Sequence, residues 1–167
     1  GLQVQNMRDW IGDHKHRGNR QCKTGYTKVR KSMGKSGLGA EGAMLVTCGG
    51  CGHGGEVYGF ASGRQRESIV FDVAVEMVEQ CPALKQRIRP MLSQKRLIYK
   101  PLGSFYQVLS AEAYTKHGLN VHGVVFDELH AQPNRQLYDV MMHGSGDARK
   151  QPLFFLITTA GTDRHSI

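Results

Sequence analysis

The sequence lacks any apolar stretch of about 18 residues, which is the length that a membrane-spanning helix needs. Its first residues, 1–5, also lack the apolar core of a secretory signal. These two absences exclude a membrane-spanning or secreted protein and predict a soluble, intracellular chain. The chain has no initial Met and ends at Ile167 soon after an apolar run, so we expect a fragment of a longer protein.

Cysteine is scarce, and only Cys48 and Cys51 of the four cysteines have the spacing of metal ligands. His53 and His130 are the other conceivable ligands. A structural zinc site needs four ligands, and no second cysteine pair with this spacing is present. Glycine dominates the segment 47–55, so we expect a flexible turn there rather than a zinc site.

Acidic residues are in the minority, with 14 Asp and Glu against 22 Lys and Arg, which gives a net charge of +8. Such a charge favours a polyanionic partner, and nucleic acid is the leading candidate. A basic domain with no such partner is the alternative. A length of 167 residues suits one α/β domain and is too short for two of ordinary size, so we expect a single domain with a poorly defined segment at 1–24.

The most informative segment is 123–128, Gly-Val-Val-Phe-Asp-Glu. An apolar run of this kind is typical of a parallel strand that is covered on both faces. Asp127 and Glu128 at its end need a metal, a cation or water, because an isolated buried carboxylate is costly. The segment therefore predicts a buried strand that ends at an active site. In the alternative, Asp127 caps the next helix and Glu128 pairs with a basic residue.

Upstream, Gly34-Lys35-Ser36 resembles the end of a phosphate-binding loop. Backbone N–H groups at a helix start bind phosphate oxygens, a Lys adds positive charge, and a Ser hydroxyl can bind magnesium. The full pattern places a first glycine at position 29, where this chain has Val29. The alternative is an exposed basic turn. Both motifs in this order, each after an expected strand, indicate an ATPase.

A third segment, 153–159, is an apolar run that ends in Thr158 and Thr159. These hydroxyls could bind the attacking water or the last phosphate, and losing that bond on hydrolysis could move the chain beyond them. In isolation, a strand end with a Ser/Thr turn is the simpler interpretation.

The periodicity of the chain predicts strands that alternate with helices, and therefore a largely parallel sheet flanked by helices. Leu45 and Ile69 are expected on buried helix faces, and Pro82 is expected to end the second helix. Strands 96–99 and 104–109 are expected to form a small β-hairpin insertion. The expected strands are 26–29, 56–61, 96–99, 104–109, 123–127 and 153–157, and the expected helices come after residue 36, residue 65 and residue 134.

Several longer runs resemble the ATPase domain of tailed-phage terminase large subunits. They are the segments 104–113, 117–132 (with Asp-Glu-Leu-His-Ala-Gln) and 158–163 (Thr-Thr-Ala-Gly-Thr-Asp), and the resemblance covers roughly residues 25–165. It implies a P-loop NTPase-type fold and a Mg²⁺-dependent ATPase that packages double-stranded DNA. It also implies a portal and a small terminase subunit as partners, a ring of copies, and the cytoplasm of an infected bacterium as the location. The family's nuclease part has no counterpart in these residues.

The resemblance also implies roles for individual residues. Lys35 and Ser36 match the phosphate-binding pair, Asp127 the magnesium-binding acid and Glu128 the catalytic glutamate. The residues implied to bind ATP are Arg30, Lys31, Gly34, Lys35, Ser36, Thr158 and Thr159, with Ser36 and Asp127 at the magnesium. Two alternatives stay open: a non-catalytic basic nucleic-acid-binding module with a degenerate P-loop, and, ranked lower, another P-loop enzyme such as a helicase. The candidates for an arginine finger are Arg30, Arg64, Arg66 and Arg149.

Overall fold

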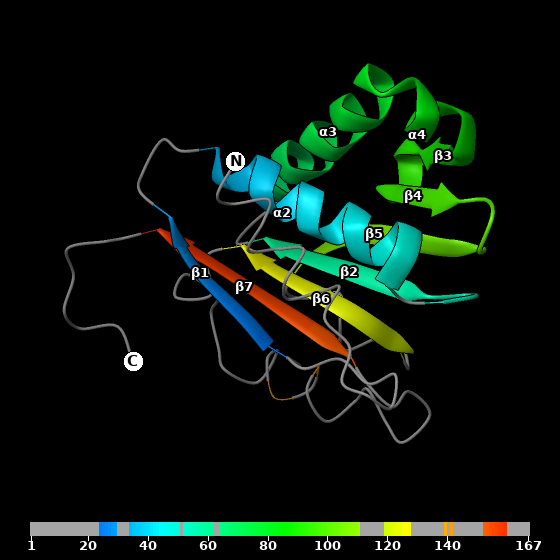
Figure 1. Cartoon of the computed structure of the whole chain (residues 1–167). Helices are drawn as coiled ribbons and strands as arrows, with labels where there is room; N and C mark the ends of the chain where they lie inside the picture. The colour runs from blue at the N-terminus through cyan, green and yellow to red at the C-terminus, as the bar shows by residue number, and fades with distance from the viewer. Residues whose placement is uncertain are drawn as a thin grey trace, which may run out of the picture.

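The structure is a computed structural model that describes residues 24–29, 34–50, 52–61, 64–110, 119–127, 139, 141 and 152–159. Within them, seven strands form one sheet in the order β1-β7-β6-β2-β5-β4-β3 (Figure 1). The strands are β1 (Thr24–Val29), β2 (Glu56–Ala61), β3 (Ile88–Met91), β4 (Arg96–Tyr99), β5 (Ser104–Ser110), β6 (Val121–Asp127) and β7 (Leu153–Thr159).

Five neighbouring strands, β1, β7, β6, β2 and β5, run parallel to one another. The remaining two, β4 and β3, pair antiparallel and extend the sheet beyond β5. The sheet is therefore mostly parallel, with helices on it and an antiparallel insertion at one end. This confirms the P-loop-like α/β fold expected from the sequence.

The described helices lie over one face of the sheet (Figure 1). They are α2 (Lys35–Leu45), which continues into the π-helical turn η1 (Val46–Gly50), α3 (Arg64–Gln80) and α4 (Pro82–Arg87). Helix α2 contacts β6 and β7, while α3 contacts β2 and β5. None of the helices in the described part of the chain is long and apolar enough to cross a membrane.

The core consists of two apolar layers, one on each face of the sheet, because strand side chains alternate between faces. The layer under the helices includes Val57, Val125, Phe155 and Ile157, together with Val70 and Phe71 of α3. The layer on the other face includes Tyr58, Phe60, Phe126, Phe154 and Leu156. Every residue of β6 is buried, as expected for a parallel strand covered on both sides.

Some details differ from the sequence-based expectations. Leu45 and Ile69 are 37% and 51% exposed, because the buried stripes of their helices pass through neighbouring positions. The chain is still helical at Cys48, so the turn expected from residue 47 starts later. Helix α3 ends at Gln80 and Pro82 begins a second helix, a position where proline's missing N–H costs nothing. Helix α4 and strand β3 were not expected.

Candidate active site

The candidate site lies where β1, β7 and β6 end. These three strands are parallel neighbours, so their carboxyl ends lie at the same edge of the sheet. The register pairs Val29 with Thr159 and Asp127 with Ile157. With neighbouring strands about 4.8 Å apart, β1 and β6 are separated by about 10 Å. The end of β1 and the acidic end of β6 therefore flank the threonines that end β7.

Three of the predicted phosphate-binding residues, Gly34, Lys35 and Ser36, lie at the start of α2. Gly34 precedes the helix in the left-handed conformation, with φ 65°, which a residue without a Cβ adopts without strain. The N–H of Leu38 donates to the Gly34 carbonyl at 3.1 Å, which closes the first helical turn. Because glycine has no side-chain oxygen to cap the helix, its first N–H groups are available to an anion. Ser36 lies in this first turn and is partly buried.

Asp127 ends β6 and is only 9% exposed. It lies two residues after Val125, which belongs to the apolar layer under the helices, so the strand alternation places Asp127 on the α2 face. Helix α2 crosses β6 and β7 on this same face. The fold thus brings the start of α2 and the carboxylate of Asp127 to one face and one edge of the sheet.

Sequence reasoning missed Tyr106, whose buried side chain lies on the same face of the sheet as this carboxylate. The Tyr106 ring packs over β2 so closely that a Cβ on Gly59 would lie 2.5 Å from its hydroxyl oxygen. Burial raises the pKa of Tyr106 above its usual range, and the negative charge of Asp127 raises it further. No described residue forms a hydrogen bond with this hydroxyl. The glycine inside β2 was the available signal, because such glycines often mark a close approach.

Other candidate residues are placed less fully. Lys35 begins α2, and Thr158 and Thr159 end β7. Arg64 begins α3, and Arg66 is exposed in its first turn. Arg30, Lys31, Glu128 and Arg149 lie outside the described residues, as do the possible metal ligands Cys51 and His130. Among the residues that are described, no group of three or more His, Cys, Asp or Glu side chains could hold a metal ion.

The donor set at this edge suits a hard divalent cation that is also bound by a phosphate. Magnesium prefers oxygen ligands and takes only one or two carboxylates from the protein, with water and phosphate oxygens completing its shell. One buried carboxylate, Asp127, and one hydroxyl at a helix start, Ser36, fit that description. The residues present therefore fit magnesium together with a nucleotide.

Residues 7–167 match a protein family described as the ATPase domain of the terminase large subunit. A terminase large subunit from Enterobacteria phage HK97 is 35% identical over 101 residues, which are 59% of this chain and 20% of that protein. The crystal structure of the HK97 large terminase matches with a TM-score of 0.70 and 30% identity, over 81% of this chain and 29% of that one. The chain thus spans less than a third of these relatives.

A third match shows how widely the fold is shared. The ATPase domain of the large terminase from Thermus phage P74-26 has a TM-score of 0.66 over 93% of this chain and 69% of that one, with 16% identity. Identity at that level shows the fold alone.

Proposed function

Because this chain belongs to the family of terminase large subunit ATPase domains, we propose that it hydrolyses magnesium-ATP to drive double-stranded DNA into a viral capsid. The observation that supports this most is the shared edge of the sheet, where the end of β1 and the end of β6 lie on either side of β7. A triphosphate can reach both groups only if they share such an edge. The non-catalytic binding module is not favoured by the family match.

The phosphates bind at the start of α2 in this proposal. The uncapped N–H groups after Gly34 donate to phosphate oxygens, and Lys35 adds a positive charge near the terminal phosphoryl group. Arg30 and Lys31 add further positive charge to the same loop. These contacts orient the phosphate chain along the carboxyl edge of the sheet, toward Asp127.

Asp127 and Ser36 would hold magnesium, which supplies positive charge to the last two phosphates when it is bound. Glu128 accepts a proton from water as the water oxygen attacks the terminal phosphorus. The bond from that phosphorus to the bridging oxygen breaks, leaving ADP and inorganic phosphate. Thr158 and Thr159 end the strand between β1 and β6, where they can respond to the loss of the terminal phosphate.

The partners belong to the same proposal. Double-stranded DNA is held through its phosphates by basic residues, because a packaging motor must act on any sequence. Copies of the full-length protein form a ring, and a portal and a small terminase subunit complete the machine. The work then takes place in the cytoplasm of the infected bacterium, or transiently on the procapsid.

Replacing the proposed catalytic base tests the mechanism directly. We expect Glu128→Ala to reduce ATP turnover by about 100-fold or more, while nucleotide affinity changes by less than about threefold, since the base acts mainly in the transition state. Phosphate release and binding of a fluorescent ATP analogue measure the two effects. Glu79→Ala is the matched control, because Glu79 is an exposed glutamate that pairs with Lys85 far from the site. Turnover of Glu128→Ala equal to that of the control would remove Glu128 from the mechanism.

A further inference from the structure

The segment from Pro82 to Ser110 contains no acidic residue. It carries six basic residues, Lys85, Arg87, Arg89, Lys95, Arg96 and Lys100, in a chain whose whole net charge is +8. It folds as α4, β3, the short 3-10 turn η2 (Leu92–Gln94), β4 and β5, and it forms the end of the sheet farthest from β1 (Figure 1). This end of the sheet therefore carries positive charge with no acidic residue in its own segment.

The hairpin of β3 and β4 has apolar side chains on one face and two arginines on the other. Ile88 and Leu97 are buried in the apolar layer under the helices. Alternation along the strands places Arg89 and Arg96 on the opposite face. The next pair outward is Arg87 and Lys100, joined by a backbone hydrogen bond of 2.9 Å from the Lys100 N–H to the Arg87 carbonyl. We call these four residues, Arg87, Arg89, Arg96 and Lys100, the basic row.

The basic row has positive charge without acidic partners among the described residues. Arg87, Arg89 and Lys100 are exposed. The ion pairs found nearby in that part of the chain use Lys85 with Glu79 and Lys95 with Glu67, so none involves the row. Arg87 and Lys100 lie opposite each other just beyond the paired ends of β3 and β4, and like charges in such positions repel. A bound polyanion would remove the repulsion between Arg87 and Lys100.

The fourth member of the row is held in place by its neighbours on β5. The Arg96 guanidinium lies 4.2 Å from the centre of the Phe105 ring. Its Nη2 donates to the Gln107 side-chain oxygen at 2.8 Å. Arg96 therefore supplies a fixed charge beside three exposed ones.

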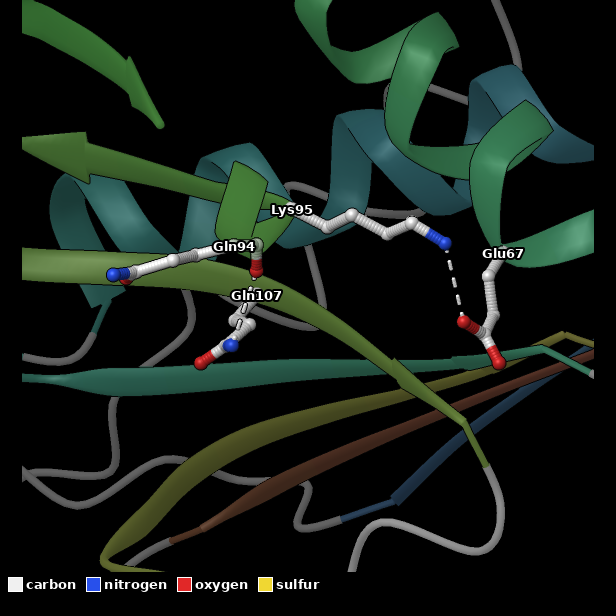
Figure 2. Close-up of polar contacts among 4 residues, drawn as sticks. All are labelled: Glu67, Gln94, Lys95 and Gln107. Atoms are coloured by element: carbon white, nitrogen blue, oxygen red, sulfur yellow. Dashed lines mark hydrogen bonds and ion pairs between the residues drawn. The ribbon is translucent and has the colours of Figure 1, made fainter. Parts of the chain in front are cut away.

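The hairpin itself is tied to the body of the domain, as Figure 2 shows. Lys95, directly after η2, places its Nζ 3.3 Å from the carboxylate of Glu67 in the first turn of α3. The Gln107 side chain of β5 donates to the Gln94 carbonyl at 3.1 Å. Because these contacts already hold the hairpin backbone, the basic row loses less conformational freedom when it binds, and more of the interaction energy remains as affinity.

We propose that the basic row is a contact surface for the phosphate backbone of double-stranded DNA. This inference rests on the proposed function and gives its DNA partner a location. Four strand spacings separate β3 from β6, which places the row about 20 Å from the nucleotide edge. DNA and nucleotide can then bind at the same time. The competing interpretation is that charge and Pro90 only keep the exposed edge strand β3 from pairing with another chain.

Two double variants that remove the same charge test the proposal in the full chain. Arg87→Gln/Arg89→Gln changes the row, whereas Arg66→Gln/Lys85→Gln removes two exposed cations from α3 and α4. Binding to a mixed-sequence DNA duplex is measured by fluorescence anisotropy from 50 to 200 mM salt. Affinity falls as salt rises, and each phosphate contact contributes about 0.9 to the steepness of log affinity against log salt. We therefore expect the plot to be less steep by nearly 2 for the row variant and almost unchanged for the control.

The outcomes separate the possible failures. Equal salt slopes in the two variants, with a parent chain that binds DNA, would overturn the basic row as the contact surface. Self-association of the row variant with unchanged DNA affinity per chain would assign these residues to edge protection instead. A parent chain that hydrolyses ATP but binds no duplex would refute the DNA contact while the nucleotide half of the proposed function stands. The circular dichroism spectra and urea midpoints of both variants, expected to match the parent, show that each is folded.

Discussion

The two ends of the sheet differ in strand direction and in where they present polar side chains. At the β1, β7 and β6 end, the strands are parallel, β6 and most of β7 are buried, and polar groups occur where these strands stop, as at Asp127. At the β4 and β3 end, the strands are antiparallel and one face carries exposed cations along the strands. A strand covered on both faces can present chemistry only at its end, whereas a half-exposed strand presents every second side chain. The comparison predicts that catalysis and binding to a polyanion can be disrupted separately.

The largest expected effect separates these two functions. We expect Asp127→Asn to lower ATP turnover by about 100-fold or more, because it removes the negative charge that would hold magnesium in the proposed mechanism, while retaining the size of the side chain. Phosphate release measured over a range of magnesium concentrations tests this.

Asp72→Asn is the control for that substitution, because Asp72 is an exposed aspartate of α3. Duplex binding at low salt is expected to stay within about twofold of the parent in Asp127→Asn, since the basic row is unchanged. If Asp127→Asn hydrolysed ATP at the parental rate, catalysis would not reside at this edge. If it lost DNA binding as well, the two ends would not be independent.

A smaller effect is expected at the ion pair between Lys95 of the hairpin and Glu67 of α3. The Glu67 side chain is 7% exposed, and its other oxygen, Oε1, accepts no hydrogen bond from any described residue. Lys95→Met removes the nearby cation and leaves this carboxylate buried, which we expect to lower the free energy of unfolding by about 2 to 3 kcal/mol. Urea denaturation measures the change.

Two further variants test the contribution of the Lys95–Glu67 pair. Lys85→Met breaks an exposed pair with Glu79 and should cost less than about 1 kcal/mol. Adding Glu67→Gln to Lys95→Met should recover much of the loss, because the buried charge is then gone. If Lys85→Met and Lys95→Met lower the free energy of unfolding equally, the Lys95–Glu67 pair contributes no more than an exposed pair. It would then not hold the hairpin against α3.

The two ends also differ in how well the sequence predicts them. Strands β6 and β7 contain the apolar runs 124–126 and 153–157, and the predicted strands 123–127 and 153–157 lie within the observed ones. Strand β3 has the sequence Ile-Arg-Pro-Met, which shows no strand pattern by itself. Its conformation comes from pairing with β4, a tertiary contact that local sequence does not encode. Buried parallel strands can therefore be predicted from their own residues, whereas this edge strand cannot.

The same limit applies to the site. The order of motifs allowed the loop at Gly34 and the acid at Asp127 to be assigned to one edge, because strand ends of a parallel sheet converge there. The roles of Lys35, Ser36 and Glu128 stay predictions from residue type and family resemblance. Gly59 signals a close approach in the sequence, but identifying Tyr106 as the residue that packs over it needs the pairing of β2 with β5. The basic row likewise needed the register of β3 and β4.

The smallest effect compares two buried tyrosines on opposite faces of the sheet. The Tyr58 hydroxyl donates to the Glu56 carboxylate at 2.8 Å, whereas the Tyr106 hydroxyl has no hydrogen-bond partner among the described residues. Burial raises the pKa of both hydroxyls above their usual range, so both are neutral from pH 6 to 9, and the comparison can be made at any pH in that interval.

Replacing each tyrosine by phenylalanine should therefore change stability in opposite directions. Tyr58→Phe loses a hydrogen bond to a carboxylate and should lower the free energy of unfolding by about 1 to 2 kcal/mol. Tyr106→Phe removes a buried hydroxyl that gains no such bond and should raise it by up to about 1 kcal/mol. Urea denaturation without nucleotide measures both. A loss of stability in Tyr106→Phe similar to that in Tyr58→Phe would mean that the Tyr106 hydroxyl has a partner, and Asp127, whose charge acts on it, is where that partner should be sought.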